Sequence, residues 1–301
     1  MGLTAAAALW AGSLLASPPG GALGVAARAG PPPECAARAP GRGAAGLGAA
    51  DRSRVRYCAQ LATAQARLAT APAESLRAAD EAATGRPRAA SPQLLAGRAL
   101  HALGRDADAW ERFAAVRAAA FTQESPDALL DLARVALAVG RVEDARAAYR
   151  RLAPRAAWLT PRWRRGEAMI EAGLVALAEG PAAVDEALTY LREAERAWAP
   201  VGSVSLIAAG LALSLDRAGR GAEARRAVRT ASDLPTLERA LEPERPWGRR
   251  LASLPSERAA LVAVVAALRG DPDARERWAE AARAGGPWAE VARARAAGRV
   301  P

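Results

Sequence analysis

The sequence predicts an all-α protein in which helical hairpins stack side by side into an α–α superhelix. Three observations carry this prediction: one well-delimited hairpin at residues 125–152, the return of its landmarks along the chain, and small residues where paired helices would cross. A single hairpin cannot bury its own apolar face, so hairpins of this kind stack on their neighbours.

The stretch 125–152 shows the repeating unit in full. Ser125 is a residue type that caps helices, and Pro126 suits a first helical turn. Apolar residues then recur at helical spacing until Gly140 and Arg141 break the helix. A second helix follows, with one apolar face formed by Val142, Ala145, Tyr149 and Leu152. With the connection to the next hairpin, the two helices make a unit of about 34 residues, the period of a helical repeat array.

The landmarks of this hairpin return along the chain. A capping residue followed by proline occurs at Ser91–Pro92, Ser125–Pro126 and Thr160–Pro161, with spacings of 34 and 35 residues. Glycines that would form the turn between paired helices are Gly104, Gly140, Gly180, Gly219 and Gly270. The alternative is an alanine-rich helical bundle in which Gly–Arg turns recur through composition, and the regular spacing argues against it.

Small residues stand at a fixed distance from these turns. Seven positions before each turn come Gly97, Ala133, Gly173, Ala212 and Ala263. Nine positions after three of the turns come the larger Phe113, Tyr149 and Val228. The turn at Gly180 fits with a two-residue insertion, which gives Leu191 this role, and the turn at Gly270 fits one residue early, with Trp278. We expect the small residues to let paired helices cross closely, and the larger ones to wedge between neighbouring hairpins.

This pattern resembles the tetratricopeptide repeat (TPR), which combines a small residue, a turn, an alanine and an aromatic residue with a period near 34. The resemblance covers residues 91–232, with a weaker copy at 256–284. The tryptophan that the family carries early in the first helix is missing, since Gln93, Leu129 and Met169 stand near that place. The resemblance implies a superhelix with a concave groove, lined by first helices, that binds a protein or a peptide.

Residues 1–24 are predicted to be a signal peptide, because 3–16 form a short uncharged apolar run followed by Ser17–Pro18–Pro19. The basic start typical of such signals is absent, so a mis-assigned start or a membrane-tethering segment stays open. Residues 25–50, rich in Gly, Pro and Ala, are predicted to be a flexible linker. We expect export to the periplasm or cell envelope, with the cytoplasm as the alternative.

Residues 51–301 are predicted to form one helical-repeat domain. Its parts are an N-terminal capping hairpin at 51–84, core repeats at 91–232, a Pro-rich insert at 233–255, and a C-terminal repeat with a closing helix at 256–297. The insert interrupts the repeats because no continuous helix tolerates its prolines, which are Pro235, Pro243, Pro246 and Pro255.

Cys35 and Cys58 are the only cysteines. In an oxidising compartment they can pair and join the linker to the first helix, and two unpaired small apolar residues are the alternative. Two cysteines and the lone His101 do not make a metal site. The sequence also lacks a nucleophile with its base and a phosphate-binding loop. We therefore expect no enzyme, no cofactor and no metal.

The net charge of +10 comes from arginine alone, since the chain has no lysine among its 42 basic residues. A basic surface favours acidic proteins, nucleic acid or lipid headgroups. The absence of asparagine and the heavy use of Ala, Gly and Pro indicate a GC-rich genome. Codon bias on solvated helix faces is therefore the simpler interpretation of the charge.

The TPR resemblance also implies which residues contact a ligand. The family's contact positions six and three residues before each turn correspond here to Arg98, His101, Arg134, Leu137, Leu174, Leu177, Leu213 and Asp216. The groove would open with arginines and then become apolar. Because guanidinium groups bind carboxylates with two parallel hydrogen bonds, we expect an acidic peptide at its N-terminal end. The alternatives are solvated arginines and a structural His101.

Two loops mix tryptophan with arginine, a combination typical of binding anchors. They supply a second, weaker set of candidates: Trp158, Trp163, Arg164, Arg165, Trp247, Arg249 and Arg250. We favour the interpretation that these tryptophans pack between repeats, because an array with long inserts must fill irregular gaps.

The function predicted from the sequence is a non-enzymatic scaffold or adaptor. It would bind a protein or peptide in the concave groove, in the envelope of a bacterium with a GC-rich genome. The alternative is a cytoplasmic basic helical-repeat protein that binds nucleic acid or a regulatory partner.

Overall fold

The computed structural model describes Cys35 and residues 48–87, 89–118, 125–197, 203–230 and 234–299. The predicted signal peptide at 1–24 and most of the predicted linker at 25–50 lie outside these residues. No helix in the described ranges is both long and apolar enough to cross a membrane.

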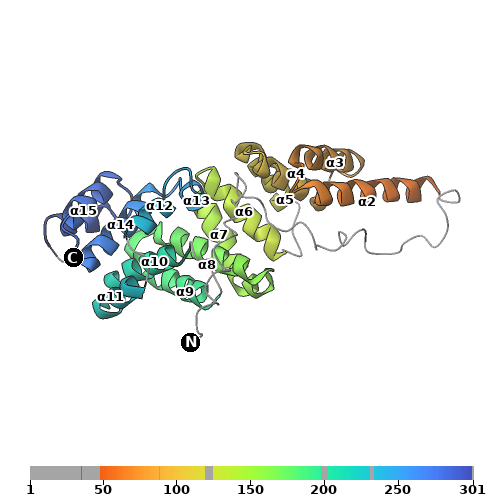
Figure 1. The fold of residues 1–301 in the computed structure, drawn as a ribbon. Coiled ribbons are helices and arrows are strands. Elements are labelled where there is room, and N and C mark those ends of the chain that lie inside the picture. Colours follow the sequence, from red (N-terminus) through yellow and green to blue (C-terminus); the bar gives the residue numbers. More distant parts are fainter. Residues whose placement is uncertain are drawn as a thin grey trace, which may run out of the picture.

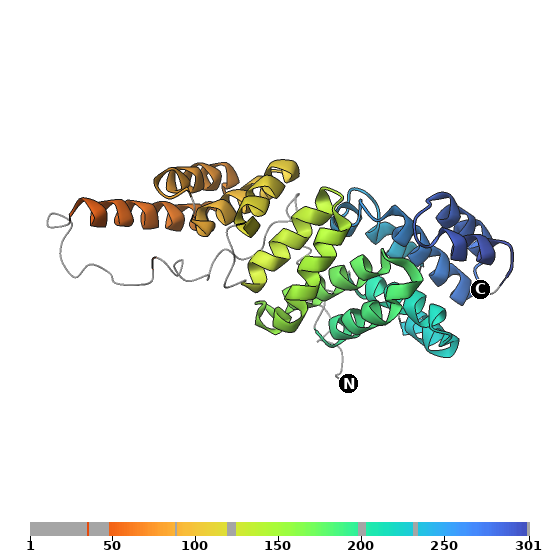
Figure 2. The ribbon, with the colours of Figure 1, turned by 180° about the vertical axis from the view of Figure 1, so that it is seen from behind.

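The described chain folds into consecutive helical pairs that follow one another along an elongated array (Figures 1 and 2). In each pair a first helix packs on a second: α2 (Ala49–Arg67) on α3 (Pro72–Gly85), α4 (Ala90–Ala102) on α5 (Asp106–Ala118), α6 (Pro126–Ala138) on α7 (Val142–Leu152), α8 (Arg162–Leu177) on α9 (Val184–Arg196), α10 (Val204–Arg217) on α11 (Gly221–Thr230), and α14 (Pro255–Arg269) on α15 (Ala274–Arg283). The predicted all-α stack of hairpins is confirmed.

Shorter elements complete the array. Two 3-10 helices extend the connections, η2 (Ala153–Trp158) and η3 (Gly180–Ala183). The predicted insert contains α12 (Leu234–Ala240) and α13 (Pro246–Arg250), and the chain closes with α16 (Ala289–Ala296). Helix α12 packs against α10 and α14, whereas α13 reaches back to α6. The insert therefore covers first helices of several hairpins.

The five predicted turn glycines all have a positive φ, between 73° and 82°. Glycine reaches this left-handed region at little cost because it has no Cβ, so it ends a helix where the chain must reverse at once. After Gly180 the chain continues into η3 before α9 begins. This 3-10 turn is the physical reason for the two-residue insertion in that repeat.

The predicted helix starts are correct at one site and wrong at two. The Ser125 hydroxyl oxygen accepts a hydrogen bond from the Ala128 amide at 3.1 Å, so Ser125 caps α6. Ser91 lies inside α4, and α8 begins only after Pro161, without a side-chain cap. Pro92 in the first turn of α4 lacks one of the amides that a cap would satisfy, and Pro161 itself takes the N-cap position of α8, where its ring offers no acceptor.

Small residues let the paired helices cross closely, as expected. A Cβ atom on Gly97 would lie 2.9 Å from Phe113 Cε2, and one on Gly173 would lie 2.6 Å from Leu191 Cγ. Leu191 also approaches the next hairpin, where a Cβ on Gly210 would lie 2.8 Å from its Cδ1. Leu191 therefore wedges between two hairpins, which is the role predicted for it.

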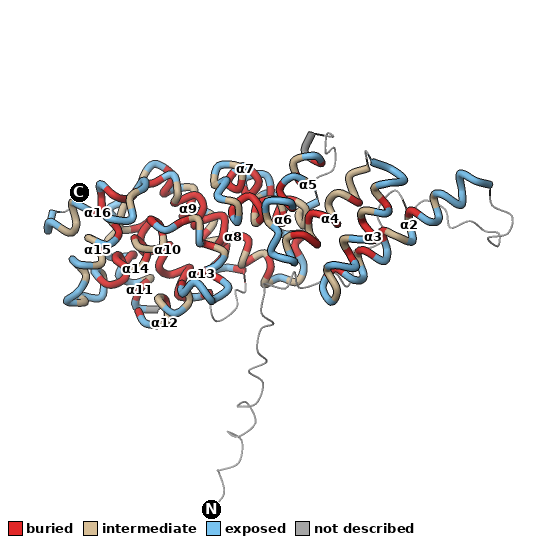
Figure 3. Tube along the Cα trace, turned by 90° about the horizontal axis from the view of Figure 1, so that it is seen from above, coloured by how far each residue is buried: buried red, intermediate tan, exposed pale blue. Residues whose placement is uncertain are grey.

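Buried side chains form a continuous core along the middle of the array (Figure 3). A smaller cluster around Tyr57, Leu61 and Leu95 joins α2, α3 and α4 at the N-terminal end. Beside this cluster, Cys35 and Cys58 form a disulfide that ties Cys35 to α2.

Candidate functional site

The first-helix face, formed by α4, α6, α8 and α10, is where the TPR resemblance places a binding groove. In this structure the same chain covers much of that face. Trp247, Leu251 and Leu254 of the insert are all buried against the array. The indole Nε1–H of Trp247 donates a hydrogen bond to the Ser203 hydroxyl oxygen at 3.2 Å. The insert is thus packed on the array, in the place where the TPR resemblance expects a ligand.

A buried ionic cluster fastens the insert to the first-helix face. We call it the Glu171 cluster and define it as Arg134 on α6, Tyr149 on α7, Glu167 and Glu171 on α8, and Arg250 on α13. The Glu171 carboxylate accepts hydrogen bonds from Arg134 at 2.9 Å and from the Tyr149 hydroxyl at 2.7 Å. Arg250 lies 3.1 Å from both Glu171 and Glu167. Two arginines thus balance two glutamates where four helices meet.

The charges of this cluster fix its protonation states. Burial by itself would raise the pKa of Glu171, but Arg134, Arg250 and the hydrogen bond from Tyr149 outweigh it and lower that pKa. Burial together with the neighbouring Glu171 charge raises the pKa of Tyr149 well above its usual value. Glu171 is therefore ionised and Tyr149 protonated near neutral pH. Both side chains form their hydrogen bonds with other residues of this chain, so the role of the cluster is structural.

The C-terminal segment covers the other end of the same face. The Trp288 indole is completely buried and donates a hydrogen bond to the Leu177 carbonyl oxygen at 2.7 Å. Pro287 lies so close to Gly180 that a Cβ there would be 2.7 Å from Pro287 Cβ. Arg295 on α16 forms an ion pair with Asp216 on α10 at 2.7 Å.

The structure places the apolar groove candidates inside the array rather than on an open surface. The side chains that the resemblance assigns to a ligand are fully packed in the core: Leu137, Leu174, Leu177 and Leu213. The family positions assume that the first helices face solvent. Here α13 packs on α6 and Trp288 binds the end of α8, and the four leucines belong to the buried core of the chain.

The polar groove candidates also have internal partners. Arg98 forms an ion pair at 2.6 Å with Asp131, whose side chain is buried. His101 Nδ1 lies 2.5 Å from Asp106 at the start of α5. Arg134 belongs to the Glu171 cluster. The acidic peptide expected at Arg98 and Arg134 would therefore have to compete with buried carboxylates of this chain.

The loop candidates divide into packed and exposed residues. Trp247 is buried, and Arg250 lies over its ring with 5.1 Å between the guanidinium carbon and the ring centroid. Arg164 is buried beside Asp127 at 2.5 Å, and Arg165 pairs with Glu193. Trp163 is half-buried and Arg249 is exposed, donating to the Glu244 carbonyl oxygen. Trp158, with 72% of its surface exposed, presents its ring to solvent.

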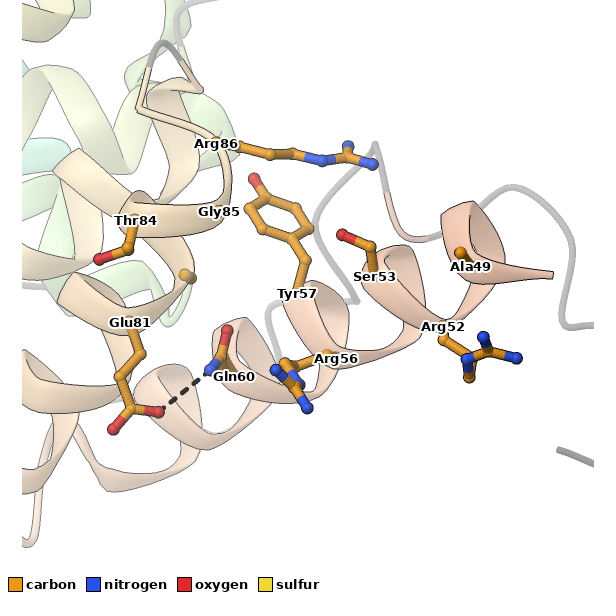
Figure 4. A pocket seen from close by; sticks show the side chains of 11 residues that line it. Ala49, Arg52, Ser53, Arg56, Tyr57, Gln60, Glu81, Thr84, Gly85 and Arg86 are labelled. Atoms are coloured by element: carbon orange, nitrogen blue, oxygen red, sulfur yellow. Dashed lines mark hydrogen bonds between the residues drawn. The ribbon is translucent and has the colours of Figure 1, made fainter. Parts of the chain in front are cut away.

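A pocket of about 560 Å³ lies between α2 and α3 at the N-terminal end of the array (Figure 4). Arg52, Ser53, Arg56 and Tyr57 line it from α2, and Glu81 and Arg86 line it from the end of α3 and the residue beyond. The sequence-based prediction included none of these residues. One feature of the sequence could have pointed to this site: three arginines within five positions, 52, 54 and 56, on the first predicted helix.

Among the residues that the structure describes, no group of three or more His, Cys, Asp or Glu side chains could hold a metal ion. The strongly shifted pKa values belong to groups engaged in ion pairs with the chain itself, such as Glu171 and Glu186.

Comparison with known proteins gives similarities of fold. No family model and no curated protein matches the sequence. One similar solved structure is a chain of the APC/C hetero-tetramer Cut9–Hcn1, at 14% identity and a TM-score of 0.43, covering 82% of this chain and 43% of that one. Another is a thermophilic TPR protein from Thermus thermophilus, at 22% identity and a TM-score of 0.35, covering 70% of this chain and 98% of that one.

The chain thus spans less than half of the length of the Cut9–Hcn1 chain that it matches. Because both TM-scores are below 0.5, the description of the fold rests on the molecule's own hairpins. Paired helices, left-handed turn glycines and small-to-large contacts recur along the described chain. By these features the chain is a TPR-like helical-repeat superhelix.

Proposed function

We propose that this protein is a non-enzymatic scaffold that binds another protein or a peptide in the cell envelope of a bacterium. The observation that carries the proposal is that the first-helix face already holds polypeptide. Helix α13 is anchored there by Trp247 and Arg250, and the C-terminal segment by Trp288. Tryptophan and arginine are the residues on which binding energy at protein interfaces concentrates.

Two observations support the envelope location. The disulfide between Cys35 and Cys58 is of a kind that persists in oxidising compartments and is rare in the cytosol. The apolar run at 3–16 suits the core of a secretory signal.

The distribution of arginines favours a protein partner over nucleic acid. Many arginines of the second helices and turns pair with carboxylates of the same array, as Arg150 does with Glu186 and Arg220 with Glu223. Such pairs break up the continuous basic stripe that phosphate backbones require.

Recovery of the full chain from its native cell tests this proposal. After mild cross-linking, we expect a complex of defined mass with one co-purifying polypeptide, and a mature N-terminus between residues 17 and 30. The purified polypeptide should rebind the purified chain with fixed stoichiometry. Recovery of the chain with an intact Met1 and only nucleic acid, released steeply as salt rises, would overturn the proposal in favour of the cytoplasmic alternative.

A further inference from the structure

The pocket between α2 and α3 presents two arginines, Arg56 and Arg86, that form no ion pair with a carboxylate of the described residues. On the basis of the proposed function, we propose that this pocket binds an acidic segment of the partner protein through the carboxylates of that segment. The pocket lies at the end of the array opposite to α14–α16, away from the insert (Figure 1). A partner can therefore reach it without displacing α13.

The aromatic ring of Tyr57 forms the floor of the pocket, and the guanidinium group of Arg86 lies above it. The Tyr57 side chain is buried, and the guanidinium carbon of Arg86 lies 4.6 Å from the centroid of its ring. Figure 4 shows Arg86 extending across the pocket over Tyr57. Stacking on a ring restricts the guanidinium group while leaving its edge for hydrogen bonds, which is how arginine pre-organises for a carboxylate.

The charge of the pocket is positive. Arg56 and Arg86 line it beside one glutamate, Glu81, and Arg52, which also lines it, is engaged in an interaction of its own. Glu81 accepts a hydrogen bond from Gln60 Nε2 at 3.0 Å, and so has a neutral partner of its own. Guanidinium groups bind carboxylates through paired, charge-assisted hydrogen bonds, so negative charge is the property that a ligand needs here.

Arginines on the first-helix face and on the α13 helix docked against it show the contrast. Arg98, Arg134 and Arg250 each meet a buried carboxylate of this chain. Within the described ranges, Arg56 and Arg86 form no ion pair, and both are exposed. The pocket thus presents exposed guanidinium groups at its opening. Elsewhere in the array, groups of this type bind carboxylates of the same chain.

The size of the pocket favours a short extended segment. A volume of about 560 Å³ lies within the usual range for ligand sites, and is too small for a docked helix with its flanking side chains. A peptide would place carboxylates against Arg56 and Arg86, whose side chains are exposed. The occupant is therefore a stretch of a few residues containing Asp or Glu.

Fluorescence anisotropy on the full chain tests this assignment. The probe is fluorescein-labelled hexaglutamate, with labelled hexaglutamine as the uncharged control. The test variant is Arg56→Gln/Arg86→Gln. The matched control is Arg269→Gln/Arg283→Gln, which removes the same charge from exposed positions on α14 and α15, at the other end of the array. Circular dichroism melts confirm that each variant is folded.

We expect the pocket variant to weaken hexaglutamate binding at least tenfold, the control variant to stay within twofold of the wild type, and hexaglutamine not to bind. Equal weakening by both variants would show a response to net charge and would overturn the assignment. So would full displacement of the probe by an equimolar concentration of inorganic phosphate, which would identify a phosphate site. Retention of the native polypeptide by the pocket variant would overturn the pocket while leaving the scaffold function standing.

Discussion

Glu171 on α8 and Arg250 on α13 form an ion pair, with 3.1 Å between the buried carboxylate oxygen Oε1 and the guanidinium nitrogen Nη1. The pair connects the insert to the first-helix face, and Arg134 on α6 binds the same carboxylate from a second helix. One carboxylate thus links three elements that are far apart in sequence.

Removal of the Glu171 charge should destabilise the fold strongly. Glu171→Gln leaves the largely buried Arg134 and Arg250 with only Glu167, and an uncompensated buried charge typically costs about 3–5 kcal/mol. Denaturant unfolding followed by circular dichroism measures the loss. The control is Glu223→Gln, which breaks an exposed pair with Arg220 and should change little. Equal effects of the two substitutions would contradict the structural role of the cluster.

Acid should weaken the contact between α7 and α9. Hydrogen bonds from Arg150 and Arg146 lower the pKa of Glu186 to about 2. In an unfolded chain the pKa of a glutamate is about 4.3. The stability that Glu186 contributes is therefore complete above that pH and is lost as the pH falls toward 2. Melting temperatures recorded between pH 6 and pH 2 should fall more steeply for the wild type than for Glu186→Gln. If the melting temperatures of the two proteins fell in parallel with pH, the predicted contribution of Glu186 to stability would be ruled out.

Glu257 on α14 should behave in the opposite way. Burial raises the pKa of this carboxyl group, so its ionisation costs more free energy in the folded state than in the unfolded chain. A raised folded pKa means that protonation relieves the penalty as the pH falls. Glu257→Gln should therefore raise the melting temperature at pH 7 and leave it nearly unchanged at pH 3. A lower melting temperature at pH 7 would show that the charged form is needed.

Close crossing of α8 and α9 depends on a glycine. In Gly173→Ala the new methyl group would lie 2.6 Å from Leu191 Cγ, and such overpacking costs about 1–3 kcal/mol. At Gly85, at the end of α3, an added methyl group would meet no atom within 4 Å, so Gly85→Ala should be neutral or gain up to about 1 kcal/mol. Chemical denaturation of both variants checks the difference. If Gly173→Ala were also neutral, the close crossing would be wrong.

Local features of the fold were predictable from the sequence. Turn glycines such as Gly104 and Gly140 follow from backbone sterics within one short segment. The pairing of Gly97 with Phe113 follows from a fixed number of residues on either side of a turn. Such relations return from hairpin to hairpin, so the sequence contains several copies of the same signal.

Contacts made by the short helices were not predictable in the same way. Helix α13 has five residues, too few for a hydrophobic period, and its partner Glu171 is remote in sequence. The groove positions taken from the TPR resemblance assume open first helices. Leu174 and Leu213 instead lie in the buried core, while α13 packs on α6 and Trp288 binds the end of α8 through contacts remote in sequence.

The most direct test of the scaffold function is site-specific photo-cross-linking of the full chain in its native cell. A photoreactive residue replaces Ser53 in the pocket, and in a parallel strain replaces the exposed Ala267 on α14. We predict a discrete adduct with one polypeptide from position 53, whose cross-linked segment is rich in Asp or Glu, and no such adduct from position 267. Folded protein that gives no polypeptide adduct from either position would contradict the account.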